Sequence, residues 1–206
     1  MQSANHHHNQ PRAARIRAAF IAVLLAALAG AFAPPAAAQE NAGRFEVGGD
    51  YNYVRTNAPP GGCGCINLNG GDGWASYNLT RSWAVVGQIG AQHASNIGGT
   101  SGADLTLTSY LFGGRFSHRI GDRLLPFAQV LLGGAHASGA LAPQNSGLGG
   151  SGNAFAFTAG GGLDIGLTRR LAIRAIDLDY YLTRFDNGVN QRQNNLKVSA
   201  GVIFRF

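Results

Sequence analysis

The C-terminal segment NLKVSAGVIFRF (195–206) carries the pattern that decides the fold. Apolar side chains occupy every second position, and most of the side chains between them are polar or absent. The apolar set is Leu196, Val198, Ala200, Val202, Phe204 and Phe206, and the opposing set is Lys197, Ser199, Gly201 and Arg205. Successive side chains of a β-strand point to opposite faces, so this period of two predicts a strand with one apolar and one polar face.

Seven further segments upstream are of strand type. They are residues 44–54, 73–79, 83–93, 104–116, 125–135, 154–165 and 171–182. The connections alternate in length, and the long ones are residues 56–72, 94–103, 138–153 and 183–194. Long loops on one side and short turns on the other are typical of outer-membrane barrels. Most of these strands are also long enough to cross a bilayer at a tilt. The sequence therefore predicts an all-β protein, an eight-stranded antiparallel up-and-down transmembrane β-barrel.

The seventh segment does not fit a single register. Arg174 has the parity of Ile176 and Leu178, whereas Asp177 and Asp179 have the opposite parity. A β-bulge shifts the parity by one residue, so we predict a bulge near Ala175 or Ile176.

The composition is typical of a single domain built from many strands that each have one apolar face. Of 206 residues, 31 are glycine, 45% are hydrophobic and only 13% are charged, about half the roughly 25% of ordinary globular chains. The net charge is +6. Three of the cations, Arg12, Arg15 and Arg17, precede an apolar segment near the N-terminus, and the remaining thirteen basic and ten acidic residues nearly balance. This balance does not favour a nucleic-acid partner.

The N-terminus is expected to be a cleaved signal peptide over residues 1–38, followed by one barrel domain over residues 39–206. An apolar core from Ala18 to Phe32 follows the arginines, and Ala36-Ala37-Ala38 offers small residues at a cleavage site. We therefore expect an integral protein of the outer membrane, surrounded by its lipid and lipopolysaccharide. The alternation ending in Val202, Phe204 and Phe206 is expected to be the signal that the outer-membrane insertion machinery recognises.

The mature chain resembles the OmpA/OmpX-type small outer-membrane barrel proteins. The matching features are residues 44–54, Tyr110-Leu111-Phe112-Gly113-Gly114-Arg115-Phe116, Pro126-Phe127-Ala128, Gly160-Gly161-Gly162-Leu163-Asp164 and Phe204-Arg205-Phe206. The resemblance implies a non-enzymatic barrel with a structural, surface-interaction or protective role in the cell envelope. We expect no cofactor and no metal, and the partners of the extracellular loops are left open.

The polar faces of the strands predict a charged interior. The side chains placed inside are Glu46, Asp50, Gln88, Arg115, Gln129, Asp164, Lys197 and Arg205, with Arg174 or Asp177 joining them. Buried charges are costly unless they are paired, so this set is expected to form a network of salt bridges and hydrogen bonds. A narrow path for ions or water is the alternative use of such an interior. A soluble barrel with an apolar ligand inside would need the opposite pattern.

Two loop features suggest further chemistry. Cys63 and Cys65 are the only cysteines, and an exported, oxidising location favours a loop disulfide between them. His93 and Ser95 share one side of a strand end, and Asp104 opens the next strand. A base, a nucleophile and an orienting acid, His93, Ser95 and Asp104, would suit hydrolysis of a lipid acyl chain. Residues 93–96 also resemble the His-x-Ser-Asn motif of lipid A 3-O-deacylases, which implies an acyl hydrolase as an alternative function. The motif lies much later in that family's chains, and the simpler interpretation is a set of polar residues that ends a strand.

Overall fold

The computed structural model describes residues 44–57, 65–97, 104–139, 150–185 and 192–206. The expected signal peptide over residues 1–38 lies outside these ranges, as do Cys63 and the side chain of Cys65, so the loop disulfide stays a prediction. Among the described residues, no helix is long and apolar enough to cross a membrane.

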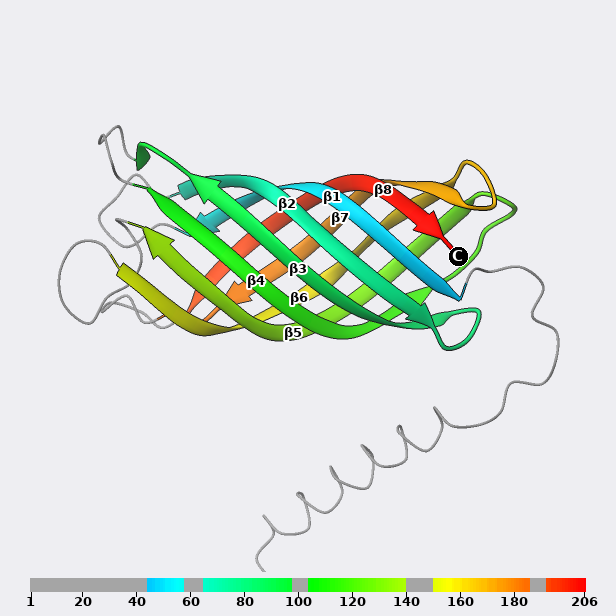
Figure 1. Ribbon diagram of the computed structural model, residues 1–206, viewed down its shortest axis with the longest axis horizontal. Helices are drawn as coiled ribbons and strands as arrows, with labels where there is room; N and C mark the ends of the chain where they lie inside the picture. Colours follow the sequence, from blue (N-terminus) through cyan, green and yellow to red (C-terminus); the bar gives the residue numbers. More distant parts are fainter. Residues whose placement is uncertain (1–43, 58–64, 98–103, 140–149, 186–191) are drawn as a thin grey trace, which may run out of the picture. The chain divides into compact units, whose positions relative to one another are not determined.

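The described chain forms a closed antiparallel barrel in which each strand pairs with its neighbours in sequence (Figure 1). The eight strands are β1 Phe45–Asn57, β2 Cys65–Asn78, β3 Trp83–Ala94, β4 Leu105–Ser117, β5 Leu124–Gly139, β6 Gly150–Gly166, β7 Leu171–Thr183 and β8 Gln193–Arg205. β8 pairs with β1 and closes the barrel, with Glu46 opposite Arg205. The predicted fold class is confirmed.

Three short turns lie at one end of the barrel, together with Phe206 (Figure 1). In the turn between β2 and β3 the Thr80 hydroxyl accepts hydrogen bonds from the backbone N–H groups of Ser82 and Trp83. Thr168 plays the same part between β6 and β7. Between β4 and β5, Gly121 has a φ of 61°, a conformation that is easiest for glycine. We call this the short-turn end and the opposite one the long-loop end.

β2 is longer than its sequence indicates. The segment 56–72 was expected to be a long loop, but residues 65–72 are paired with β1, and only 58–64 connect the two strands. Asparagine and glycine in this stretch suggest a loop, yet Leu68 is fully buried. Asn67 and Asn69 face outward and accept hydrogen bonds from the Tyr53 and Tyr51 hydroxyls, at 2.8 and 2.9 Å. The expected loop is therefore wrong because cross-strand tyrosines hold the asparagines in the sheet.

The bulge in β7 lies where the parity conflict predicted it. Leu163 pairs with Ile176 and the next residue of β6, Asp164, pairs with Arg174, so Ala175 has no partner on β6. The register against β8 shifts between Arg174 and Asp177 as well. Arg174 and Asp177 consequently both face the interior. The predicted bulge is confirmed, and both residues join the interior set, of which only one or the other was expected.

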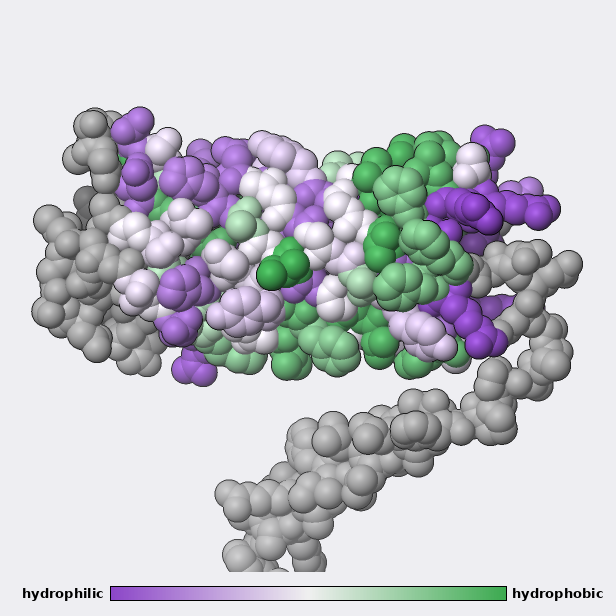
Figure 2. All heavy atoms as spheres, viewed as in Figure 1, coloured by the Kyte–Doolittle hydropathy of each residue, from purple (hydrophilic) through white to green (hydrophobic). Residues whose placement is uncertain are grey.

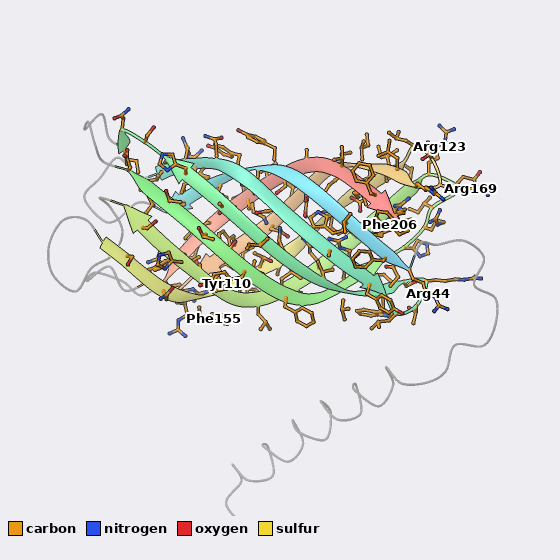
Figure 3. The ribbon with its side chains drawn as sticks, viewed as in Figure 1. Arg44, Tyr110, Arg123, Phe155, Arg169 and Phe206 are labelled. Atoms are coloured by element: carbon orange, nitrogen blue, oxygen red, sulfur yellow. The ribbon has the colours of Figure 1, made fainter. Side chains whose placement is uncertain are left out.

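The outer face of the barrel has an apolar band that begins at the short-turn end (Figure 2). Phe45, Trp83 and Phe204 are among the exposed large side chains near that end, and Tyr110 and Phe155 lie toward the other limit of the band (Figure 3). Arg44, Arg123 and Arg169 extend beyond the band at the short-turn end. Aromatic side chains at both limits of an apolar belt are typical of barrels that span a bilayer.

Beyond this band the strands continue toward the long-loop end with the opposite arrangement of side chains. We call this part the collar; it comprises residues 65–70, 92–94, 105–109, 135–139 and 150–154. Polar residues such as His93, Thr106 and Asn153 face outward there, whereas Leu68, Leu107 and Ala137 are buried inside. Such a reversal is expected where water, in place of hydrocarbon, surrounds a barrel.

Candidate functional site: the barrel interior

The structure places every residue of the expected polar network inside the barrel. Each is at most 9% exposed: Glu46, Asp50, Gln88, Arg115, Gln129, Asp164, Arg174, Lys197 and Arg205. The interior is polar over only part of its length, however. An apolar cluster that includes Val54, Leu68, Leu107 and Leu131 lines the rest and continues into the collar. The predicted residues therefore fill only part of the interior, and inward apolar side chains fill the rest.

Arg174 on β7 is the centre of the network. Its guanidinium donates to Asp164 on β6 through Nε and Nη2, at 2.9 and 3.3 Å, and to Asp50 on β1 through Nη1, at 3.0 Å. Asp177 lies 3.6 Å from Nη1. Asp50 also accepts from the Trp74 indole N–H at 2.8 Å. One cation thus links three strands across the barrel, and its fork of donors suits two carboxylates at once.

Two aromatic rings support the arginines of this cluster. The Cζ atoms of Arg115 and Arg174 lie 4.5 and 4.4 Å from the centroid of Trp74, and 4.8 and 4.6 Å from that of Phe127. A guanidinium at this distance from a ring is attracted by the negative ring face. Arg115 further donates from Nε and Nη2 to the Gln129 side-chain oxygen, at 3.3 and 3.0 Å.

A second cluster is built around Lys197 of β8. Its Nζ lies 2.8 Å from Asp72 of β2 and 3.5 Å from Asp179 of β7. Asp72 also accepts from the side-chain amides of Gln88 and Gln92, at 2.7 and 3.0 Å. The side-chain amide of Gln129 donates to both Asp177 and Asp179 and so joins the two clusters.

A separate ion pair lies at the seam where the barrel closes. Arg205 of β8 donates from Nε to Glu46 of β1 at 2.9 Å. In the described interior the buried charged residues are six carboxylates and four cations. The cations are distributed over β4, β7 and β8, so the network connects strands that are distant in sequence.

Sequence reasoning missed several members of these clusters. Asp72 was assigned to the expected loop, and Trp74 was not assigned to either face of its strand. Both have the same parity as the inward Ser76, which would have placed them inside. Phe127 was read only as part of a family segment, and Asp179 was left open by the register of the seventh strand. The common signal was parity, which needed the correct length of β2 and the position of the bulge.

The proposed hydrolase residues lie at the outer rim of the collar and make other contacts. His93 Nδ1 is 2.9 Å from the Thr106 hydroxyl, and Asp104 accepts from the backbone N–H of Asn96 at 3.3 Å. Both His93 and Ser95 are exposed. None of the hydrogen bonds between described residues joins His93, Ser95 and Asp104 to one another. The three lie near one another in the fold but do not form a connected triad there.

The residues of the expected insertion signal face outward at the short-turn end. Val202, Phe204 and Phe206 are 45, 48 and 70% exposed. The Phe206 ring lies 6.3 Å from that of Phe45, and its backbone N–H donates to the Phe45 carbonyl at 2.9 Å. Within the described ranges, no group of three or more His, Cys, Asp or Glu side chains could hold a metal ion.

Known barrels with the same architecture are similar to this chain in fold. Neisserial surface protein A superimposes with a TM-score of 0.61 at 16% identity, covering 81% of this chain and all of that one. Ail of Yersinia pestis, solved with the heparin analogue sucrose octasulfate, gives 0.50 at 17%, covering 79% and 99%. The N-terminal β-barrel domain of Pseudomonas aeruginosa OprF gives 0.49 at 18%, covering 80% and 100%.

A match to a family model identifies the family of the chain. No curated protein is significantly similar to the chain. The family model described as "Outer membrane protein beta-barrel domain" matches residues 23–204. That match spans all eight strands almost to the end of β8. The chain therefore belongs to the outer membrane protein beta-barrel domain family.

Proposed function

We propose that this protein is a closed, non-conducting anchor in the outer membrane that holds a rigid collar above the bilayer, in a structural or surface-interaction role. The observation that carries the proposal is the filled interior. Arg174 is bonded to β1 and β6 from its place on β7, and Lys197 is bonded to β2 and β7 from β8. An eight-stranded barrel is only wide enough for its own side chains, so these bonds obstruct its axis.

The apolar cluster adds a second obstruction toward the long-loop end. Val54, Leu68 and Leu131 are fully buried there. A dissolved ion that entered this part would lose its hydration without gaining a polar partner. The charged clusters and the apolar cluster thus oppose conduction for different reasons, and both would have to rearrange in a pore.

The connections beyond the collar support a surface role that depends little on charge. Residues 58–64, 98–103 and 140–149 contain no charged side chain, and residues 186–191 contain only Asp186. Ail has been solved with a heparin analogue, but an anionic glycan would meet few cations in these connections. We therefore expect partners that recognise backbone, amide and small apolar groups.

Conductance measurements on the purified protein in a planar lipid bilayer test this function. We expect insertion without lasting current steps, because the clusters around Arg174 and Lys197 and the apolar cluster all remain in place. Stable open-channel steps in the wild-type protein would instead favour the ion or water path.

The acyl hydrolase is tested separately by the mass profile of lipid A from cells with and without the protein. We expect the same profile in both. Loss of one acyl chain that depends on the wild-type protein, and that disappears in Ser95→Ala, would establish the hydrolase and overturn an anchor without catalytic activity.

A further inference from the structure

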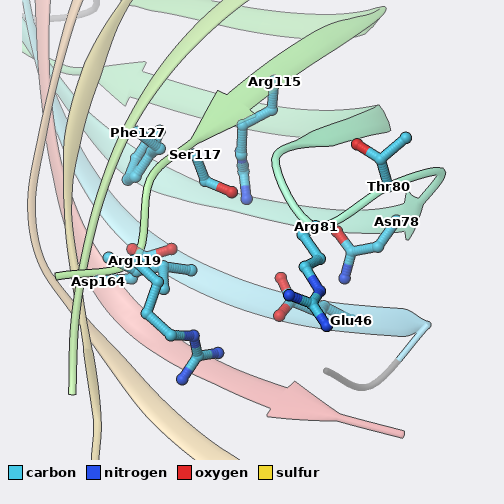
Figure 4. Close-up of a pocket in the computed structure, with 10 residues that line it drawn as sticks. Glu46, Asn78, Thr80, Arg81, Arg115, Ser117, Arg119, Phe127 and Asp164 are labelled. Atoms are coloured by element: carbon cyan, nitrogen blue, oxygen red, sulfur yellow. The ribbon is translucent and has the colours of Figure 1, made fainter. Parts of the chain in front are cut away.

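The short-turn end of the barrel contains a recess of about 400 Å³ that opens beside the turns (Figure 4). Its lining includes Glu46, Arg81, Arg115, Ser117, Arg119 and Asp164. Arg115 reaches it from within the barrel, Arg81 from the turn between β2 and β3, and Arg119 from the turn between β4 and β5. The recess is large enough for a small solute, at the lower end of the usual size of ligand pockets.

Arg115 is the one buried cation of the described interior that forms no ion pair. Its side chain is buried, with only 4% exposed, and the other three buried cations each form an ion pair. No described carboxylate forms an ion pair with Arg115, which is held by two ring faces and by the Gln129 oxygen. Both of those hydrogen bonds come from Nε and Nη2. Nη1 has no hydrogen bond to the described residues, and Arg115 is part of the lining of the recess.

Arg119 is a further cation at the opening. Its only hydrogen bond within the described chain is a 3.5 Å contact from Nη1 to the Asp122 carbonyl, and it forms no ion pair there. The two carboxylates of the lining are already occupied, since Asp164 is bonded to Arg174 and Glu46 to Arg205. The hydroxyl of Ser117 provides a neutral donor in the same lining.

We propose that this recess binds a small anion, a carboxylate or a phosphate group, through Arg115 and Arg119. A guanidinium presents several N–H donors in a plane and forms strong charge-assisted hydrogen bonds to either group. The rings of Trp74 and Phe127 fix Arg115 in advance, so little side-chain entropy is lost on binding. In barrels of this kind the short turns face the periplasm, which places the site on that side of the membrane.

The fluorescence of Trp74 provides a local measurement of binding. The chain has two tryptophans, and Trp83→Phe leaves Trp74, whose ring lies against Arg115, as the only tryptophan, which is excited selectively at wavelengths that tyrosine does not absorb. The folded protein in a non-ionic detergent is titrated at constant ionic strength with inorganic phosphate, with N-acetyl-alanyl-alanine, and with the uncharged amide of that dipeptide. Saturation by phosphate alone would identify a phosphate site, and saturation by the acid but not the amide would identify a carboxylate site.

A matched pair of arginine variants distinguishes anion binding in the recess from a general attraction of anions to the positive charges at this end of the barrel. Arg119→Gln removes a cation of the lining, and Arg169→Gln removes one at the same end that does not line the recess. Loss of one charge-assisted contact should weaken binding about tenfold in Arg119→Gln, with no change in Arg169→Gln. Equal weakening in both variants, or no saturable response to any probe, would overturn the proposal. Both side chains are exposed, so neither variant should prevent folding.

Discussion

Removal of Arg174 should be among the most damaging single substitutions in this barrel. The side chain is about 1% exposed, and it contacts Asp164, Asp50 and Asp177. In Arg174→Met the Asp164 carboxylate loses both of its described donors, whereas Asp50 keeps the indole N–H of Trp74. Leaving one partner of a buried pair without the other typically costs about 3–5 kcal/mol of folding stability, or roughly a thousandfold in the ratio of folded to unfolded protein.

The measurement is denaturant unfolding of the protein in lipid vesicles, followed by tryptophan fluorescence. Arg174→Lys keeps the charge but loses the planar fork of donors, so we expect a stability between those of the wild type and Arg174→Met. Arg123→Met removes an exposed cation at the short-turn end and should change the stability by no more than about 0.5 kcal/mol. If Arg174→Met were as stable as Arg123→Met, the interior ion pairs would not be holding the barrel together.

Three further predictions concern the band, the bulge and the glycines. Leu132→Arg places a charge on the apolar band and should cost about 2–4 kcal/mol, against about 1 kcal/mol or less for Ser138→Arg in the collar; vesicle unfolding of the two variants compares them. Deletion of Ala175 removes the residue that lets the charges on both sides of the bulge face inward, and it should abolish folding as judged by electrophoretic mobility before and after boiling. At Gly48 an added Cβ would lie 2.3 Å from the Trp74 ring, whereas at Gly87 it would meet nothing within 4 Å; Gly48→Val should therefore lower the unfolding midpoint, and Gly87→Val should leave it unchanged or raise it.

The strand count, the antiparallel order and the bulge were within reach of the sequence because they depend on local alternation. Parity alone marked the conflict between Arg174 and Asp177, and a single inserted residue resolves it. The same rule failed at β2, because asparagine and glycine are more common in loops than in strands. Only the cross-strand partners Tyr51 and Tyr53 show why Asn69 and Asn67 stay in the sheet.

The partners inside the barrel were beyond the sequence for a different reason. Lys197 meets Asp72 at a separation of 125 residues, and Arg174 meets Asp50 at 124. Parity predicts that such residues face inward, but the pairing depends on the tilt and stagger of strands on opposite walls. The position of Arg115 between two rings, and hence its role in the recess, likewise follows from the register of β2, β4 and β5 together.

Reversal of the side-chain pattern in the collar follows from the same physics as the band. Residues 67–69 alternate between the two faces as residues 195–206 do. Here, however, the apolar side chain, Leu68, faces inward, and the polar Asn67 and Asn69 face outward. Alternation therefore identifies a strand without saying which face meets lipid. Along β2 the apolar side chains switch from the outer to the inner face. We interpret this switch as the level at which the surroundings of the barrel change from hydrocarbon to water.

Electrophoresis of the detergent-extracted membrane fraction, with and without boiling, tests the central claim most directly. A closed barrel that spans the membrane and is held by buried ion pairs should resist the detergent at room temperature and migrate differently only after boiling. Absence of that shift, with the protein recovered in the soluble fraction without detergent, would contradict both the membrane-spanning band and the inward network on which this account rests.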